Sequence, residues 1–589
     1  MQKQTLPQLL SRLWPHIDRP RRVQFGLLFL LMVVASFAEV LSIGAVLPFL
    51  GILTAPEMIF GHPNAQPLIQ LFSFTEPKQL LLPLTIVFAF SALLSGFFRL
   101  MLLWTQTHLS QAVGADFSLN IYRKTLFQSY AVHVSQNSSE VVAGVRSKAN
   151  ALVSLVILPI MVMVSSFLML LSIMIALLAI EPIIAISSFM GFGVIYLLVV
   201  RSTRKALIRD GQLMNQNSVR VLKALQEGLG GIRDILIDGT QKTHCEIYSD
   251  ADLPYRRAEA SISIISNSPR FGIESLGMVL IAGLAYTMAG RSGGMINAIP
   301  VLGALALGAQ RLLPVIQQSY SSFSNMRGGQ AFLSDALDLL DQPLPDHAEE
   351  PLPSPMPFEH SISLNDLSFR YSENTPWVLQ HGLNLTILKG SRVGFIGTTG
   401  SGKSTLLDII MGLLDPSAGS LSIDGVDVNY KNHRAWQVHI AHVPQNIFLG
   451  DTTVAENIAF GVPTNEIDIA RMRQAAQKAQ IAQTIESWEK QYNTIVGEQG
   501  VRLSGGQRQR IGIARALYKK ADVIVFDEAT SALDNDTELA VMDAIEKLGD
   551  NITVLIVAHR LSTLKNCMEI VDLVDGKIAR VGSYQEIIE

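Results

Sequence analysis

The sequence predicts a two-part fold: a membrane bundle of six transmembrane helices with long cytosolic extensions, followed by an α/β domain of the phosphate-loop type. Composition is the first observation, because hydrophobic residues make up 49% of the 589 residues and charged residues only 16%. A soluble protein carries about 25% charged residues, and the apolar excess falls within residues 1–340. The second observation is the stretch 341–358, rich in prolines and acids, which predicts an extended linker before a domain at 359–589.

Six apolar runs within residues 1–340 are long enough to cross a membrane, which takes about 20 mostly apolar residues. The third and fourth are separated only by Glu181 and Pro182, and proline suits the first turn of a new helix, so these two form a tight hairpin. Arginines precede the first run, which is too long for the core of a secretory signal and is interpreted as a retained span. The predicted spans are 24–52, 80–104, 151–180, 182–200, 261–289 and 298–319.

Lysines and arginines gather before the first run and in the segments 105–150 and 201–260. The positive-inside rule therefore predicts that both termini and the 359–589 domain are cytoplasmic. Both basic segments keep helical spacing of apolar residues, so we expect helices that continue past the membrane and turn back near 128–133 and 240–247. A solvated basic loop is the alternative, but loops of this length are uncommon.

Residues 397–404 read Gly-Thr-Thr-Gly-Ser-Gly-Lys-Ser and match a phosphate-binding loop. An apolar strand, 392–396, precedes them and an apolar helix, 405–413, follows, which is the context that this motif requires. Backbone N–H groups and the helix N-terminus bind phosphate oxygens, while Lys403 is predicted at the β- and γ-phosphates and Ser404 on Mg²⁺. The predicted nucleotide contacts here are Gly397, Thr398, Thr399, Gly400, Ser401, Gly402, Lys403, Ser404 and Thr405.

Two later strands end in polar residues that would meet the phosphate loop at one sheet edge. Strand 522–526 delivers Asp527, predicted to bind Mg²⁺, and Glu528, predicted to orient or deprotonate the attacking water. Strand 553–558 delivers His559, predicted to contact the γ-phosphate. Together with the loop, these residues predict ATP hydrolysis with Mg²⁺ as cofactor.

The run Leu-Ser-Gly-Gly-Gln at 503–507 opens a helix and resembles the signature sequence of ABC ATPases. The order and spacing of the motifs are similar to that family over the whole 359–589 domain. The resemblance implies that Tyr371 stacks on adenine and that Gln445 contacts Mg²⁺ and reports on the γ-phosphate. It also implies that segment 494–498 meets helices of the membrane domain and that Asp534 lies in a loop facing a partner.

In this family the signature of one domain completes the nucleotide site of another. The resemblance therefore implies that Ser504, Gly505, Gly506 and Gln507 bind ATP held by a second chain. The chain carries one loop and one signature, so two copies are expected, most simply as a C2 homodimer. The predicted catalytic residues are Glu528, His559 and Gln445, all intact. A net charge of −4 gives no reason to expect a nucleic-acid partner.

Spans followed by one ATPase domain resemble the half-transporters among ABC exporters, which implies a bacterial inner-membrane protein. Charged residues within spans usually face protein or a cavity, so Glu39, Arg99, Arg270 and Arg311 are candidate substrate contacts. An alternative is that Arg270 pairs with Glu274 and that Arg99 extends to the interface. Two-fold symmetry would double Arg270 and Arg311, and such a ring of arginines favours an anionic, diphosphate-bearing group.

Short stretches of the spans resemble the PglK-type flippases for lipid-linked oligosaccharides. They are 38–49, Ser268 to Arg270 with Glu274, and Arg311 to Pro314. The predicted function is ATP-driven flipping or export of a lipid-linked, diphosphate-bearing oligosaccharide or similar anionic glycolipid, with membrane lipid around the protein. The alternatives are an exporter of peptides, drugs or other lipids, and an ATP-gated channel or regulatory protein on the same scaffold.

Overall fold

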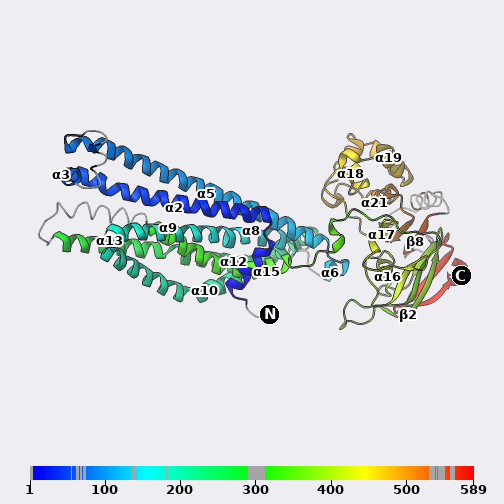
Figure 1. Ribbon diagram of the computed structural model, residues 1–589. Helices are drawn as coiled ribbons and strands as arrows, with labels where there is room; N and C mark the ends of the chain where they lie inside the picture. Colours follow the sequence, from blue (N-terminus) through cyan, green and yellow to red (C-terminus); the bar gives the residue numbers. More distant parts are fainter. Residues whose placement is uncertain are drawn as a thin grey trace. The chain divides into compact units, whose positions relative to one another are not determined.

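The computed structural model describes residues 4–54, 56–61, 66, 69–70, 74–135, 141–180, 182–289, 312–528, 538, 540, 551–557 and 564–588. The chain forms two compact units (Figure 1). The first comprises Met1–Gln128 and Gln136–Pro345, and the second Ser129–Ser135 and Asp346–Glu589.

Long helices make up the first unit. They are α2 (Arg19–Thr54), α5 (Leu81–Leu126), α9 (Leu158–Ile180), α10 (Pro182–Gly230), α12 (Gln241–Asn267) and α13 (Pro269–Ala289). Helix α5 has 46 residues and is therefore about 70 Å long at 1.5 Å per residue. That is more than twice the roughly 30 Å of a bilayer core. The predicted helical extensions are confirmed, because both basic segments are helical over most of their length.

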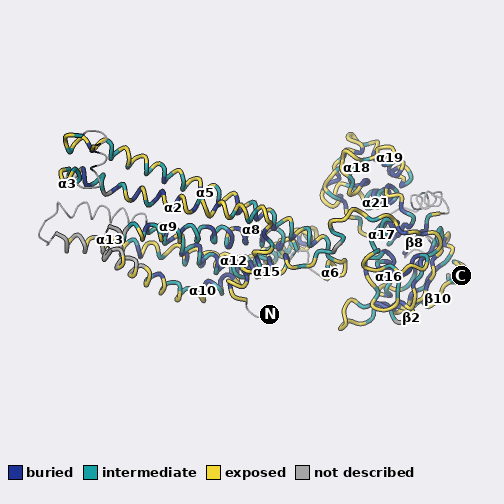
Figure 2. Tube along the Cα trace, in the orientation of Figure 1, coloured by how far each residue is buried: buried dark blue, intermediate teal, exposed yellow. Residues whose placement is uncertain are grey.

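Three stretches of the described chain are long and apolar enough to cross a membrane: Arg19–Leu53, Pro77–Leu126 and Ala143–Ala176. Exposed positions recur along α2 and α5 (Figure 2). Large apolar residues are among them, such as Leu30, Phe37 and Leu93. Apolar side chains facing outward suit a lipid environment. Most of the sixth predicted run, 298–311, lies outside the described residues.

Shorter helices connect and extend these. The first unit contains α1 (Leu6–Leu13), α3 (Pro56–Phe60), α8 (Ala149–Leu152), α11 (Ile232–Asp238), α15 (Gln330–Leu340) and a helix over residues 312–328, and α6 (Tyr130–Ser135) groups with the second unit. The predicted fifth span, 261–289, contains a junction at Ser268, where α12 ends and α13 begins with Pro269. Proline fits there because a first-turn N–H needs no helical partner.

Helix α10 and the helix over 312–328 approach each other backbone to backbone. A Cβ atom built on Gly211 would lie 2.1 Å from the carbonyl oxygen of Gly328. No larger residue fits at position 211 without moving one of the helices. Glycine at position 211 therefore allows these helices to pack this closely.

The second unit contains two sheets. The larger has the order β10-β9-β3-β8-β7-β6, and the smaller is antiparallel with the order β2-β1-β4-β5. Strands β9, β3, β8, β7 and β6 run parallel, so their carboxyl ends share one edge. The strands are β1 (Ser361–Phe369), β2 (Leu379–Leu388), β3 (Arg392–Ile396), β4 (Ala418–Ile423), β5 (Val426–Asp427), β6 (Ile440–Val443), β7 (Val523–Asp527), β8 (Thr553–Val557), β9 (Glu569–Val574) and β10 (Lys577–Gly582).

Helices pack around these sheets and bury two apolar cores. They are α16 (Lys403–Ile410), α17 (His433–Gln437), α18 (Val454–Ile458), α19 (Ile469–Lys478), α20 (Ala482–Glu486), α21 (Gly505–Lys519) and α23 (Tyr584–Ile588). Met356 and Phe358 are buried in the core beside Trp436. The end of the predicted 341–358 linker thus belongs to the second unit and is not a free spacer.

Candidate nucleotide site and membrane-domain charges

The phosphate loop runs from the end of β3 into α16. Gly397 has φ 142°, and a Cβ there would lie 2.2 Å from the carbonyl oxygen of Leu573. Gly402 has φ 99° and precedes the first residue of α16. Only glycine adopts both conformations without strain. The loop therefore turns tightly and leaves the N–H groups of the first turn of α16 available for an anion.

Lys403 lies over this loop. Its Nζ donates hydrogen bonds to the carbonyl oxygens of Gly397, at 2.8 Å, and Thr398, at 2.9 Å. Burial lowers the pKa of Lys403, and the charges of Glu528 and Asp527 oppose that shift. The ammonium is therefore held between backbone oxygens and two acids, where phosphate oxygens could replace the backbone contacts.

Two adjacent acids stand at the end of β7. Burial raises the pKa of Asp527, and the charge of Glu528 raises it further, whereas Lys403 and a hydrogen bond from Ser404 lower it. Glu528 has a left-handed backbone, φ 51°, and its N–H donates to Val557 of β8 at 3.0 Å. Such a conformation is uncommon for a residue with a Cβ and is often found at functional sites.

Gln445 follows β6 by two residues and reaches the same place. Its Nε2 donates a 2.6 Å hydrogen bond to Oε2 of Glu528. The parallel sheet thus brings together the predicted residues Lys403, Ser404, Gln445, Asp527 and Glu528. Predicted residues His559 and Asp534 lie outside the described residues.

An aromatic ring lies beside the start of α16. The hydroxyl of Tyr371 is 3.4 Å from Oγ1 of Thr405, and its ring packs edge-on against Phe369. Tyr371 is 48% exposed and is accessible to a ligand, and its stacking on adenine stays a prediction.

Sequence reasoning missed Asp408 and Tyr130. Burial and the nearby charge of Asp527 raise the pKa of Asp408 on α16 to about 6. Burial also raises the pKa of Tyr130 on α6, with further contributions from Asp408 and Tyr371. An acid inside an otherwise apolar helix was the available signal for Asp408. No motif indicates Tyr130.

The signature residues begin α21. Ser504 caps the helix, since its Oγ accepts from the N–H of Gln507 at 3.2 Å and its own N–H donates to Oε1 of Gln507 at 2.9 Å. This reciprocal pair is a capping box. Gly505 and Gly506 form the first turn, and Ser504 is exposed in the single chain. The arrangement presents a helix N-terminus that can receive an anion.

Oxygen atoms near the loop fit Mg²⁺. Among the described residues, no group of three His, Cys, Asp or Glu side chains could hold a metal by itself. Mg²⁺ commonly takes one or two protein oxygens and completes its shell with phosphates and water. The Asp527 carboxylate, hydrogen-bonded to the Ser404 hydroxyl, supplies such a pair.

The charged residues of the membrane domain pair with one another. Glu39 on α2 is fully buried, and its Oε1 lies 2.8 Å from Nη2 of Arg99 on α5. Ser95 also donates to Glu39. Sequence analysis named Glu39 and Arg99 separately and did not predict this contact. Arg270 lies 2.6 Å from Glu274 through Nε and Oε1, as one alternative expected. Arg311 lies outside the described residues.

Comparisons with known proteins identify the family of this chain. The family model for ABC transporters matches residues 380–531. An ATP-dependent lipid A-core flippase from Alkalilimnicola ehrlichii is 30% identical over 408 residues, covering 68% of this chain and 67% of the flippase. This chain belongs to the ABC transporter family. It hydrolyses ATP in a cycle coupled to transport.

Two further similarities describe this ABC transporter. A lipid A-core flippase from Saccharophagus degradans is 38% identical over 267 residues, 45% of this chain and 44% of the flippase. The solved structure of a bacterial Atm1-family ABC exporter with ATP bound superposes with a TM-score of 0.77, covering 97% of this chain and 96% of that one at 22% identity. The predicted fold, a helical membrane domain followed by an ABC ATPase domain, is confirmed.

Proposed function

We propose that this ABC transporter flips an anionic glycolipid across the bacterial inner membrane, with both termini in the cytoplasm. The observation that carries the proposal is a pair of arginines on membrane-domain helices, each held by an acid yet partly exposed. Arg99 is 40% exposed beside Glu39, and Arg270 is 59% exposed beside Glu274. A guanidinium binds phosphate oxygens through a planar fork, so anchored arginines suit a phosphate-bearing head group.

Two substrates fall within this class. A lipid-linked oligosaccharide with a diphosphate is the one the sequence predicts, and the relatives are named for lipid A-core. Both combine a lipid, an anionic group and sugars.

The geometry of the described residues supports their roles in ATP hydrolysis, and the roles of His559 and Asp534 rest on the family resemblance. Backbone N–H groups of the loop and Lys403 bind the phosphates, and Tyr371 packs against the base. Ser404 and Asp527, with Gln445, would hold Mg²⁺, which neutralises phosphate charge when bound. Glu528, oriented by the 2.6 Å hydrogen bond from Gln445, accepts a proton from the attacking water. His559 would contact the γ-phosphate, and Asp534 would face the partner.

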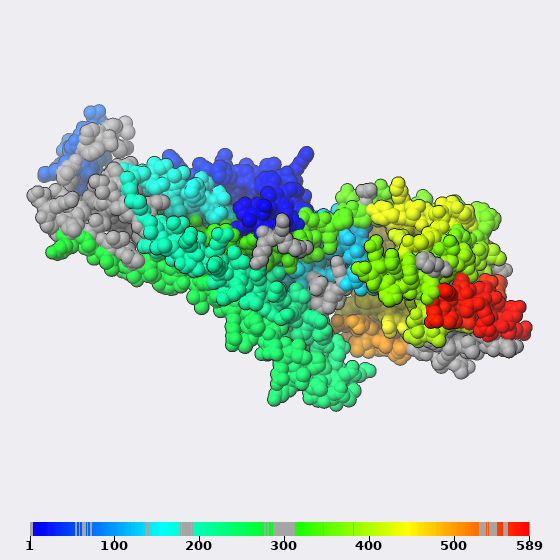
Figure 3. Space-filling view, turned by 90° about the horizontal axis from the view of Figure 1, so that it is seen from below, coloured from blue at the N-terminus to red at the C-terminus, as the bar shows by residue number. Residues whose placement is uncertain are grey.

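A homodimer of two identical chains fits this function best. The exposed start of α21, at Ser504, can receive the γ-phosphate of a nucleotide bound by a second copy. The hairpin formed by α10, α11 and α12 also projects from the first unit. Figure 3 shows it in the green that marks residues near 230–250. At its tip Leu236 is 60% exposed and Ile237 is 74% exposed. Grouped exposed apolar side chains indicate a protein contact, and a second copy supplies one.

The substrate is tested in proteoliposomes with a polyprenyl-diphosphate oligosaccharide, rough lipopolysaccharide and a neutral glycolipid. Both anionic lipids, or one of them, should stimulate ATP hydrolysis and be flipped. Arg270→Ala should reduce flipping about tenfold, because a charged hydrogen bond contributes about 1.5–3 kcal/mol, while basal hydrolysis changes less than about twofold. Arg209→Ala, at an exposed arginine paired with Asp210, is the matched control. Transport of the neutral lipid or of peptides alone would contradict the proposal.

Shared sites are tested by mixing two inactive variants. Lys403→Ala removes the phosphate contact of one chain, and Ser504→Arg blocks the signature of the other. A heterodimer of the two retains one intact site, so mixing before reconstitution should restore a clear fraction of wild-type hydrolysis. Mixtures that stay as inactive as the separate variants would exclude sites shared between copies.

A further inference from the structure

Two helix ends of opposite charge meet in the first unit. Arg12 lies in the last turn of α1, whereas Asp338 and Asp341 lie at the end of α15. A helix C-terminus favours a cation and disfavours an acid, by about 0.3–1 kcal/mol each. Arg12 is therefore well placed by its own helix, but the two acids are not. Their position is favourable only if a cation from elsewhere faces them.

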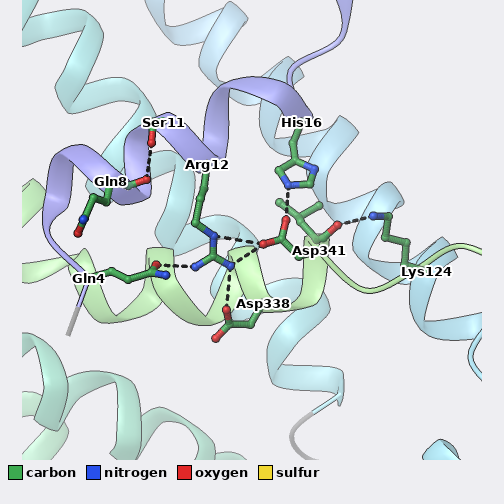
Figure 4. A network of polar contacts seen from close by, with 9 residues as sticks. Gln4, Gln8, Ser11, Arg12, His16, Lys124, Asp338 and Asp341 are labelled. Carbon is green, nitrogen blue, oxygen red and sulfur yellow. Dashed lines mark hydrogen bonds and ion pairs between the residues drawn. The ribbon is translucent and has the colours of Figure 1, made fainter. Parts of the chain in front are cut away.

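Arg12 is that cation (Figure 4). Its Nη2 lies 3.0 Å from Oδ1 of Asp338, and its Nε lies 3.2 Å from Oδ2 of Asp341. The ring of His16 reaches the other oxygen of Asp341, with Nε2 at 2.7 Å from Oδ1. Gln4 also accepts a hydrogen bond from Nη1 of Arg12, at 2.6 Å. One guanidinium therefore bridges both acids and is held in place by Gln4, which precedes α1.

Apolar packing fixes the same two helices beneath these charges. Leu9 and Leu13 of α1 are buried in one cluster with Leu333, Leu337 and Leu340 of α15. This packing holds α1 against α15, but apolar attraction itself has no direction. The ion pairs of Arg12 also resist sliding of α15 along its axis, because such a movement would separate the guanidinium from Asp338 and Asp341.

The end of α15 is held from a second side by α5. Nζ of Lys124 donates to the carbonyl oxygen of Leu340, and Nε2 of Gln128 donates to that of Pro343 at 3.1 Å. Leu340 is the last residue of α15, and Pro345 is the last of the first unit. The point where the chain leaves the membrane domain is thus fixed to α1 and to α5.

We propose that Arg12, His16, Asp338 and Asp341 form a coupling clamp at this exit. Movement of the ATPase domain reaches the membrane helices in part through the covalent chain at 341–345. A clamped exit passes that movement to α1, which continues into α2, and to α5. Without the clamp, residues 341–345 would move with the ATPase domain and the membrane helices would respond less. These four are positioning residues, and none is part of the nucleotide site.

The test compares ATP turnover with the response of the membrane helices in the full-length protein in lipid nanodiscs. Deuterium uptake of α2, α5 and α10 is measured without nucleotide and after trapping with ATP and vanadate. Arg12→Ala should keep the ATPase rate within about twofold of wild type but reduce the nucleotide-induced change in uptake to less than about half. A purely structural loss would lower both together.

Arg21→Ala is the matched control. Arg21 pairs with Asp116 at 2.7 Å, with exposures of 28% and 32%, and joins α2 to α5 instead of α15. It should retain both ATPase rate and uptake change. The exchanged pair Arg12→Asp with Asp341→Arg should recover most of the response. A normal response in Arg12→Ala, or an equal loss in Arg21→Ala, would overturn the clamp.

Discussion

The two units place their acids in opposite surroundings. In the ATPase domain Asp408, Asp527 and Glu528 lie close to one another, and burial together with like charge raises the pKa of the first two. In the membrane domain Glu39 faces Arg99, and Asp335 faces Lys148 and Asn215. The first arrangement costs stability and suits a site that takes up a metal-bound nucleotide. The second arrangement holds helices together.

Glu528→Gln tests the first arrangement and should have the largest effect. A general base contributes about 100-fold to 10,000-fold in rate, so steady-state ATP hydrolysis should fall at least about 100-fold. Binding of a fluorescent ATP analogue should persist, because the loop and Lys403 are untouched. Hydrolysis within tenfold of wild type would remove Glu528 from the role of base.

Glu39→Gln tests the second arrangement. Loss of one partner leaves Arg99 beside a buried neutral group, and breaking a buried ion pair costs about 3 kcal/mol. Thermal unfolding of the purified transporter should therefore shift clearly downward, with ATP affinity unchanged. The double variant Glu39→Met with Arg99→Met should recover part of the loss. An unchanged melting temperature in Glu39→Gln would show that the pair does not stabilise the bundle.

Asp408→Asn separates burial from charge in the ATPase domain. The pKa of Asp408, about 6 in the folded protein, exceeds its ordinary value, so its contribution to stability is present at low pH and is lost as pH rises from about 4 to 6. After allowance for partial exposure, the variant should be more stable than wild type above pH 6 by about 1 kcal/mol, or about 2–4 °C in Tm. The advantage should shrink towards pH 4, and a difference that does not vary with pH would contradict the assignment.

Glu274→Gln should have the smallest effect on stability. Arg270 and Glu274 are four residues apart on α13 and partly exposed, and such pairs contribute less than about 0.5 kcal/mol. The melting temperature should stay within about 2 °C of wild type. A larger loss would place this pair with Glu39 and Arg99 as a structural contact and weaken its proposed role towards substrate.

Much of the nucleotide site could be predicted because its residues follow strands of one parallel sheet. Strands 392–396 and 522–526 were predicted, so Lys403 and Asp527 had to meet at one edge, whereas Gln445 was expected only from the family resemblance. The left-handed backbone of Glu528 could not be predicted, since it depends on a hydrogen bond to Val557 of β8. Asp408 was overlooked because its helix was treated as uniformly apolar.

The membrane domain was less predictable, because hydropathy gives the length of a helix but not its rotation or depth. To predict that Glu39 pairs with Arg99, one needs the rotation and the depth of both α2 and α5. The junction at Ser268 was also not predicted, because the apolar run is continuous across the change from α12 to α13. The linker prediction failed in part because Met356, which lies between two prolines, and Phe358 insert into the core of the ATPase domain.

The close approach of Gly211 and Gly328 has a consequence for how the bundle can move. Interlocked side chains resist rotation, because each must leave its groove before the helices turn. At this point only backbone separates α10 from the helix over 312–328. Farther along, the same two helices interlock through side chains, because the rings of Tyr196 and Tyr320 lie 5.4 Å apart. Rotation is therefore easiest at Gly211 and is limited by the contact between these two tyrosines.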